Sequence, residues 1–371
     1  MLKMEKSVNT SKTAVMHFRN SRIKRTQFRF KFRLSEIKIV ETYKYLGLIF
    51  HEHLDFNVTS KVLADSGGRA LGALYSKYKS NNGFGFKTYT KLYHSGVAPI
   101  IDYNSSIWGF GEHDCINSIQ NRAIRLYLGL HRFAPNCAIN GDMGWAPSKI
   151  RRHSNIIRFW NRIVNIDENR LTKKVFRWDK SFKHVNWCYE LALMLNTVSM
   201  FDSFTEECPI NVKVIKEKLL ELYKNDWRIK VEATPKLRTY FTYKETYCCE
   251  PFTKIINNRR YRSITAQFRC GILPLAIETG RYNNIPIEFR LCNYCNENVI
   301  EDESHFLLYC PVYDELRNSL FSKAFDNNEN FVNMSNSMKF KLLMSRDMIR
   351  FTAEFLHKAY EKRRSLTYVT N

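Results

Sequence analysis

Residues 290–317 read RLCNYCNENVIEDESHFLLYCPVYDELR and place three cysteines and one histidine close together in the chain. Cys292 and Cys295 form a Cys-x2-Cys pair, and His305 and Cys310 follow shortly after it. Thiolate and imidazole groups are the usual ligands of tetrahedral zinc, and a Cys-x2-Cys turn brings two sulfurs to one metal. Four protein ligands leave no open coordination position. The spacing therefore predicts a structural zinc site, which would hold together a segment too short to form its own core.

Other interpretations of this segment stay open from the spacing alone. The chain has 10 cysteines, so the Cys-x2-Cys pair could be coincidental, and His305 could be a core histidine beside the apolar residues 306–308. The occurrence of all the ligand types in one short segment favours zinc. The three acids at positions 301–303 are expected to form a solvated turn and not to bind the metal.

The composition of the 371 residues points to a folded, basic protein. Hydrophobic residues make up 44% of the chain, and 58 Lys and Arg against 36 Asp and Glu give a net charge of +22. Such an excess predicts a polyanionic partner, RNA or DNA, although a solvated basic surface is the alternative. The sequence has no apolar run of membrane-spanning length and no signal-peptide core, so no membrane partner is expected. Reduced cysteines then fit the cytoplasm or the nucleus.

The N-terminal region is rich in basic residues and carries an alternating segment at residues 28–33, FRFKFR. Alternation predicts a strand with three phenylalanines on one face and Arg29, Lys31 and Arg33 on the other. This strand could be a solvated sheet edge or could follow a phosphate backbone. Residues 37–50 predict two further strands, in which Gly47 suggests a bulge or a close approach of another backbone.

Apolar residues at helical spacing predict that most of the remaining chain is α-helical. The expected helical segments are residues 86–97, 116–130, 156–164, 212–223 and 340–359. Pro99 is expected to end the first of these, and the Gly- and Pro-containing residues 141–147 are expected to form a loop. The predicted fold is mainly α, with a small N-terminal antiparallel β element.

The residues around the predicted zinc ligands resemble the C-terminal region of reverse transcriptases from LINE-type (non-LTR) retrotransposons. In that family Arg-x-Cys-x2-Cys precedes Val/Ile-Glu-Asp-Glu-x-His-Phe-Leu-Leu-x-Cys-Pro, and this chain has RLCNYC at residues 290–295 and IEDESHFLLYCP at residues 300–311. Residues 99–109, 236–240 and 269–282 look similar to the same enzymes. Asn9, Lys12 and Thr13 resemble the Asn-x-x-Lys-Thr segment late in the palm, and Tyr45-Leu46-Gly47 resembles the strand pair that holds the primer end.

The resemblance implies an order of regions along the chain. That order is end-of-palm strands at residues 1–56, a thumb-like helical domain at 57–148, a helical linker at 149–284, a CCHC zinc-knuckle-like module at 285–325, and a C-terminal amphipathic helix and tail at 326–371. The truncated palm remnant would supply the β element of the fold.

The resemblance also implies that the chain is a fragment of an RNA-directed DNA polymerase. In the family, aspartates in an aromatic-x-Asp-Asp motif hold the catalytic magnesium ions and precede the Asn-x-x-Lys-Thr segment, which here begins at residue 9. Asp65 is a single aspartate that follows Gly47, so it does not match that motif. We expect no catalytic residue and no polymerase activity from this chain alone, with magnesium belonging only to the intact enzyme. Another interpretation is an intact enzyme of which this sequence covers one half.

Nucleic-acid contacts are expected mainly from basic residues, which bind phosphates without much sequence preference. The candidates are Lys12, Arg29, Lys31, Arg33, Tyr45, Gly47, Arg259, Arg260 and Arg262. Tyr43 and Tyr45 could stack on single-stranded bases, but aromatic side chains in strands are more often buried, and burial is the expectation. The rival interpretation is a zinc-stabilised protein-interaction module whose basic charge is incidental. The sequence carries no signal for an oligomeric state.

Overall fold

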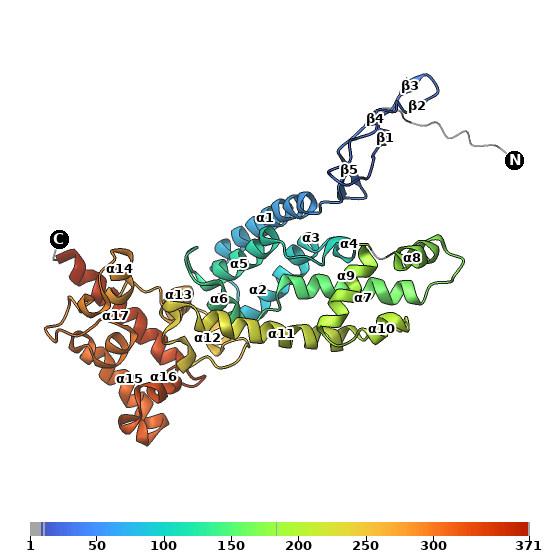
Figure 1. Ribbon diagram of the computed structural model, residues 1–371. Coiled ribbons are helices and arrows are strands. Elements are labelled where there is room, and N and C mark those ends of the chain that lie inside the picture. The colour runs from blue at the N-terminus through green and yellow to red at the C-terminus, as the bar shows by residue number, and fades with distance from the viewer. Residues whose placement is uncertain (1–8, 10–11, 183, 370–371) are drawn as a thin grey trace. The chain divides into compact units, whose positions relative to one another are not determined.

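The structure is a computed structural model that describes Asn9 and residues 12–182 and 184–369. The described part is mostly helical, with short strands confined to its first segment (Figure 1). This confirms the prediction of a mainly α fold. None of the described helices has both the length and the apolar composition needed to cross a bilayer.

The chain forms two compact units, each assembled from separate segments. Unit 1 consists of Met1–Ala70, Val97–Asn117 and Arg151–Ile210, and unit 2 consists of Leu71–Gly96, Ser118–Ile150 and Asn211–Asn371. The segment with the predicted zinc ligands and the C-terminal helix both belong to unit 2. The five consecutive regions expected from the sequence stay a prediction.

Six short strands lie among the described residues of the N-terminal part of unit 1. They are β1 (Ala14–Val15), β2 (Lys31–Phe32), β3 (Ser35–Glu36), β4 (Lys38–Ile39), β5 (Thr42–Tyr45) and β6 (Leu48–His51). The pairs β2–β3 and β5–β6 are antiparallel, as expected, whereas β1 and β4 pair in parallel. The expectation of a purely antiparallel element is wrong for this pair. The β2–β3 hairpin lies between β1 and β4 in sequence, and β4 runs in the same direction as β1.

The alternating segment at residues 28–33 is not one continuous strand. Only Lys31 and Phe32 are in β2, because Arg33 adopts a left-handed φ of 55° and begins the turn to β3. Phe28 is exposed and packs edge-on against Phe30, with ring centroids 4.9 Å apart. The predicted row of three phenylalanines on a strand face is therefore wrong.

Gly47 belongs to the turn between β5 and β6. Leu46 and Gly47 have φ values of 47° and 84°, as in a two-residue type I′ hairpin turn. The ring of Tyr103 lies against this turn, and a Cβ atom on Gly47 would be 3.1 Å from its Cε1 atom. The Tyr103 hydroxyl also donates a hydrogen bond of 2.9 Å to the carbonyl of Leu46. The predicted bulge is absent, and the close approach involves a side chain of the same unit.

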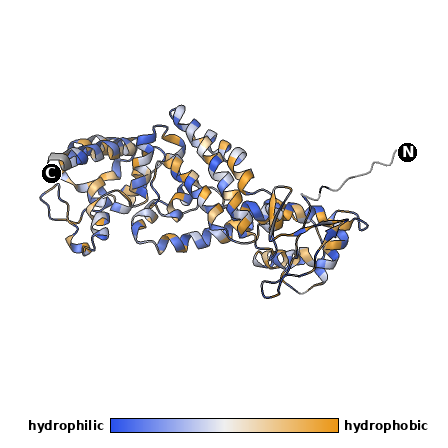
Figure 2. Cartoon of the chain, turned by 90° about the horizontal axis from the view of Figure 1, so that it is seen from above, coloured by the Kyte–Doolittle hydropathy of each residue, from blue (hydrophilic) through white to orange (hydrophobic). Residues whose placement is uncertain are grey.

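Within the described residues, eight α-helices contribute to unit 1, and three of them continue into unit 2. The three are α1 (Asn57–Ser80), α5 (Asp114–Leu128) and α7 (Ser148–Val164); the others are α3 (Ala98–Ile101), α4 (Ser105–Trp108), α8 (Leu171–Ser181), α9 (Trp187–Thr197) and α10 (Asp202–Thr205). The core of this unit contains Trp160, whose ring stacks on Phe204 at 5.6 Å and whose Nε1 donates to the carbonyl of Cys208. Figure 2 shows that hydrophobic and hydrophilic residues alternate along individual helices, as amphipathic packing requires.

Unit 2 carries the remaining helices of the described chain. Its α-helices are α2 (Phe86–Leu92), α6 (Asn136–Met143), α11 (Val212–Glu232), α12 (Pro251–Ile255), α13 (Arg259–Arg269), α14 (Ala276–Tyr282), α15 (Asp314–Asn327), α16 (Asn336–Leu343) and α17 (Ile349–Val369). Its shorter turns are η1 (Tyr93–Val97, which ends at the border of unit 1), η2 (Pro235–Leu237), η3 (Tyr240–Thr242), η4 (Ile287–Phe289), η5 (His305–Tyr309), η6 (Pro311–Tyr313) and η7 (Glu329–Asn333). Helices α12, α13 and α15 all pack on α17 (Figure 1).

Three expectations about where helices end or break are wrong. Pro99 lies in the first turn of α3, where its missing N–H costs no helical hydrogen bond, so it does not end the helical run. Residues 141–143 complete α6, and the predicted loop starts only at Gly144, with φ 63°. The expected helix at residues 340–359 is divided into α16 and α17. The Thr352 hydroxyl donates to the carbonyl of Leu343 at 2.7 Å and so satisfies the end of α16.

A buried charge network joins α6, α12 and α13 within unit 2. Arg269 donates to both carboxylate oxygens of Asp142, at 2.7 and 2.9 Å, and pairs with Glu250 at 2.9 Å. Lys244 pairs with the same Glu250 at 2.7 Å. The side chains of Arg269 and Asp142 are fully buried, and removal of one partner from such a pair leaves an uncompensated charge. The network therefore specifies how these three helices meet.

Candidate metal centre and nucleic-acid residues

The first two predicted ligands lie in a short hairpin that ends in an isolated bridge between Leu291 and Ile300. The amide of Cys292 donates to the carbonyl of Val299 at 2.9 Å, which closes the hairpin next to the first ligand. Asn298 takes a left-handed φ of 52° and turns the chain back. This hairpin holds Cys292 and Cys295 on the same tight loop.

The other two ligands lie at the ends of one π-helical turn, η5. The amide of Cys310 donates to the carbonyl of His305 at 2.7 Å, so one wide turn brings the two residues next to each other. Pro311 then begins η6 and directs the chain away. Single π-turns occur frequently at functional sites. The four predicted ligands therefore come from two turns that follow each other in the chain.

The ligand atoms of Cys292, Cys295, His305 and Cys310 all lie within 4.8 Å of one another. The sulfur of Cys295 is 3.4 Å from Nε2 of His305. Sulfurs bound at 2.3 Å in a tetrahedron would be about 3.8 Å apart, so these separations suit a single ion. The cluster could therefore hold a metal such as zinc, and its four ligands would fill the coordination sphere.

The three thiols of the cluster differ in the direction of their pKa shifts, which is downward for Cys292 and upward for Cys295 and Cys310. A hydrogen bond from the Cys310 thiol lowers the pKa of Cys292 well below the ordinary value for a thiol. The same hydrogen bond, together with burial, raises the pKa of Cys310. Thiolates are the form that binds metal, and metal binding releases the remaining protons. We expect binding to become stronger as the pH rises through the pKa values of the protonated thiols.

The acids between the ligands do not form a solvated turn, which corrects the expectation from the sequence. Glu301 and Glu303 are buried, and Glu303 accepts from Arg238 at 2.6 and 3.0 Å. Asp302 accepts from the amide of His305 at 2.8 Å and so orients the start of the π-turn. Glu301 and Glu303 are buried because arginines from other parts of unit 2 pair with them, and local sequence does not report such distant partners.

Glu301 connects the loop that carries the four candidate ligands, residues 291–310 (the metal loop), to the C-terminal helix. Its carboxylate accepts from Arg363 of α17, with one contact of 2.9 Å, and from the amide of Ala276 at 2.6 Å. The guanidinium of Arg363 also lies 4.1 Å from the centre of the Tyr294 ring, between the two ligands of the Cys-x2-Cys pair. Sequence reasoning missed Arg363, to which it assigned no role.

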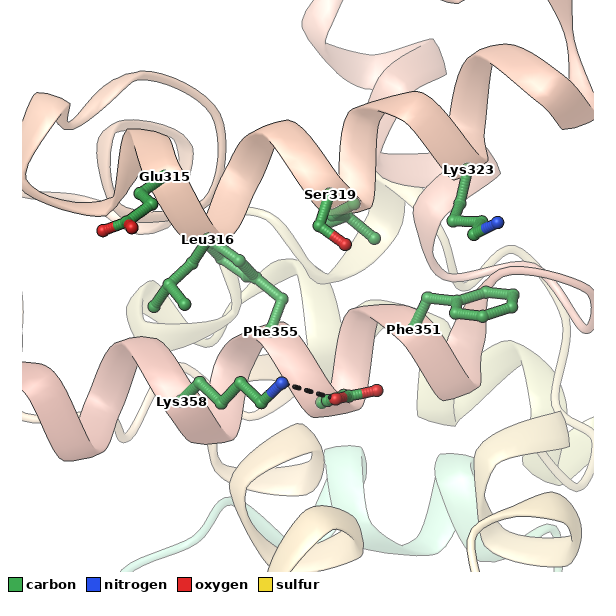
Figure 3. A pocket seen from close by; sticks show the side chains of 9 residues that line it. Glu315, Leu316, Ser319, Lys323, Phe351, Phe355 and Lys358 are labelled. Carbon is green, nitrogen blue, oxygen red and sulfur yellow. Dashed lines mark ion pairs between the residues drawn. The ribbon is translucent and has the colours of Figure 1, made fainter.

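A separate hollow of about 300 Å³ lies between α15 and α17 (Figure 3). Leu316, Phe351 and Phe355 form its apolar part, and Lys358 pairs with Glu354 at 2.6 Å along one side. None of the four cluster ligands lines it. Glu315, Ser319 and Lys323 also line the hollow, which is therefore a separate feature of mixed polarity and not part of the metal cluster.

The N-terminal candidates for nucleic-acid binding are all exposed. They are Lys12, Arg29, Lys31, Arg33, Tyr45 and Gly47. The hydroxyl of Tyr43 donates to the carbonyl of Lys12 at 3.3 Å, which places this lysine beside β5. Tyr43 and Tyr45 are both exposed and, two residues apart in one strand, lie on the same face. The expectation that these tyrosines are buried is wrong, because the residues that the structure describes leave both rings exposed.

The basic stretch near residue 260 divides into exposed and buried side chains. Arg259 and Arg260 are exposed, and Arg259 donates to the Tyr75 hydroxyl at 2.9 Å. Arg262 is buried and donates to the carbonyls of Tyr127 at 3.1 Å and Ile256 at 2.9 Å. The prediction that Arg262 contacts nucleic acid is therefore wrong, since helix α13 turns this side chain inward and its guanidinium serves internal packing.

Comparisons with family models, with curated proteins and with solved structures found no match for this chain. Function is therefore argued from the residues of the chain and from their geometry. The converging Cys and His side chains and the exposed basic and aromatic residues of the N-terminal segment are the two features that carry chemistry.

Proposed function

We propose that this chain is the C-terminal, nucleic-acid-binding part of a non-LTR retrotransposon reverse transcriptase, with one structural zinc ion. The observation that carries the proposal is that Cys292, Cys295, His305 and Cys310, at the positions expected from the resemblance, converge within 4.8 Å. The net charge of +22 supports a polyanionic partner. The cluster has no position for a substrate once four ligands bind, so its role is to stabilise the fold.

The N-terminal strands are the surface that best suits single-stranded nucleic acid. Exposed aromatic rings stack on bases of any sequence, and nearby cations bind the phosphates. Tyr43 and Tyr45 offer two such rings on one face of β5, and Lys12 lies beside Tyr43. Arg29 and Lys31 add exposed charge in the same unit. RNA is the natural ligand of this surface because a reverse transcriptase follows an RNA template.

The alternative is a zinc-stabilised protein-interaction module with incidental charge. The buried acids around the metal loop are compatible with it, since they serve folding and not nucleic-acid binding. The two functions differ in their dependence on salt. Phosphate contacts release counterions and weaken steeply with salt, whereas an apolar protein interface does not.

Titration of the purified chain with fluorescein-labelled single-stranded RNA tests the proposal. If Lys12, Arg29, Lys31 and Arg33 each neutralise one phosphate, the affinity should fall about 50-fold between about 50 and 200 mM salt. Tyr43→Ala with Tyr45→Ala should weaken binding at least about tenfold at either salt concentration, because each stacked base contributes about 1–3 kcal/mol.

Two further variants serve as controls for this titration. Arg260→Gln removes an exposed charge, whereas Arg262→Gln removes a buried one, so Arg262→Gln should lower stability without a specific effect on RNA affinity. A flat salt response combined with unchanged affinity in the tyrosine variant would contradict the proposed function and favour the protein-interaction module.

A further inference from the structure

Helix α8 has an apolar stripe that faces solvent. Leu171, Val175, Trp178 and Phe182 are 76%, 53%, 64% and 44% exposed. The spacing of four and three residues places Leu171, Val175 and Trp178 along one side of α8, in the pattern of a coiled-coil seam. Phe182 follows the end of the helix in an extended conformation and continues the stripe through its contact with Trp178. Solitary exposed apolar residues are common, but a continuous stripe of four is typical of an interaction site.

The opposite side of α8 already packs on its own unit. Phe176 meets Trp160 edge-on, with ring centroids 5.7 Å apart. Lys173 is buried and donates to the carbonyls of Ile163 and Val164, both at 3.2 Å, at the end of α7. The stripe is therefore not the side that holds α8 in the fold, and it can bind a partner without rearrangement of the unit.

The cations around the stripe differ in how they are paired. Arg177 pairs with Glu168 and Glu207, and Lys180 pairs with Glu207 at 2.7 Å, so those charges are compensated. Arg162, Arg170 and Lys174 have no ion pair within the part of the chain that the structure describes. Uncompensated positive charge thus borders the apolar stripe.

Two of these cations line an open hollow at the N-terminal end of the stripe. The hollow has a volume of about 780 Å³ and is bordered by Arg162, Arg170 and the apolar side chains of Ile166 and Leu171. Asn161 and Asn165 add amide groups. This combination suits an acidic side chain that sits next to an apolar one.

We propose that the α8 stripe is a docking surface for an amphipathic helix of a partner protein, with apolar residues along its seam and acidic residues along its flank. Helical spacing of the stripe fits a helix better than a nucleic acid, because two of the four side chains are aliphatic and cannot stack on bases. Trp178 and Phe182 are also packed edge-on against each other, with centroids 4.7 Å apart. A second copy of this chain is disfavoured, since its own stripe is bordered by the same cations, Arg170 and Lys174, and not by an acidic flank.

The test uses the full chain and a fluorescein-labelled designed peptide of about three heptads, with leucine at its seam and glutamate at its flanks. The peptide is kept dilute enough that it does not pair with itself. Saturable anisotropy is expected with the glutamate peptide. A matched peptide with lysine in place of glutamate should bind at least about tenfold more weakly.

Paired variants of the protein locate the site. Leu171→Gln with Trp178→Gln should weaken binding at least about tenfold, whereas Ile229→Gln, at an equally exposed position of α11, should have no effect. Arg170→Glu with Lys174→Glu should reverse the preference toward the lysine peptide, and Lys216→Glu on α11 should not. The Leu171→Gln, Trp178→Gln variant tests the affinity for the peptide, and the Arg170→Glu, Lys174→Glu variant tests the preference between the two peptides. A folding defect in one variant therefore leaves the other test intact.

Several outcomes would overturn the proposal. They are an absence of saturable binding, equal binding of both peptides, and binding that the Leu171→Gln, Trp178→Gln variant leaves unchanged. Loss of RNA binding in that variant, with RNA displacing the peptide, would assign the stripe to nucleic acid. Sedimentation of the chain as a dimer that the same variant dissociates would assign the stripe to self-association.

Discussion

Glu301 shows how one side chain can serve two parts of unit 2. It directly follows the hairpin of residues 291–300 (the metal hairpin), and its carboxylate is buried. There it accepts hydrogen bonds from Arg363 and from the amide of Ala276. Burial raises the pKa of this carboxyl, and Arg363 opposes that shift. A buried carboxylate without its arginine would be strongly destabilising. The residue therefore joins the position of the metal loop to the position of α17.

Substitution of one candidate ligand should show whether zinc binding depends on the cluster or on any cysteine of the chain. Cys295→Ser removes one ligand, and we expect a loss of zinc affinity of more than about 100-fold, larger than the loss from altered outer-shell partners. Cys208→Ser is the matched control, because Cys208 is exposed and lies outside the cluster. The measurement is zinc content after dialysis against a competing chelator. Equal zinc retention by the two variants would contradict the assigned ligand set.

At the scale of elements, the metal hairpin, η5 and α17 form one connected set. Removal of the metal by a strong chelator should loosen residues 291–310 and, through Glu301, the part of α17 around Arg363. Hydrogen exchange should increase in both segments. Helix α11 serves as the control, because none of the described hydrogen bonds of Glu301 involves it, and its exchange should not change. Protection of α17 that stays unchanged while the hairpin loosens would show that the two elements are independent.

The N-terminal strands are expected to be sensitive to acid through Glu52. This side chain is 3% exposed and accepts from Arg25 and Arg19, both at 2.8 Å. The hydrogen bond from Arg25 lowers the pKa of Glu52 from 4.5 to about 2. A carboxyl with a lowered pKa stabilises the fold above its unfolded pKa, and this contribution is lost as the pH falls from about 4.5 toward 2.

Nuclear magnetic resonance of the arginine side chains can follow this transition. The guanidinium N–H signals of Arg19 and Arg25 should shift together in a titration centred near pH 2, the pKa of Glu52 in the native protein. Glu52→Gln should abolish the transition, because glutamine does not titrate. Titration of both signals in the variant as in the native chain would rule out Glu52 as the group responsible.

For the whole molecule, the net charge and the search for catalytic aspartates lead to different expectations. The net charge of +22 favours a nucleic-acid partner, yet the sequence contains no two adjacent aspartates of the kind that hold the catalytic ions of a polymerase. We expect the purified chain, with magnesium, primed RNA template and deoxynucleotides, to bind the template without extending the primer. An intact reverse transcriptase run in parallel shows that the assay works, and primer extension by this chain would refute the prediction.

The sequence by itself determined the features that depend on short spacings. The ligand set of the cluster, the helical class of the fold and the position of α5 follow from residues a few places apart, where periodicity and ligand geometry act directly. The separation of α16 from α17 did not follow, because the Thr352 hydroxyl that ends α16 comes from a residue beyond the helix.

Only the tertiary structure decided which charged and aromatic side chains are available. Arg260 and Arg262 are two residues apart and look equivalent in sequence, yet the first is exposed and the second is enclosed by α13 and its neighbours. Glu301 was expected in solvent and is buried, while Tyr43 and Tyr45 were expected in the core and are exposed. Burial depends on which distant segments pack over a residue, and local sequence does not contain that information.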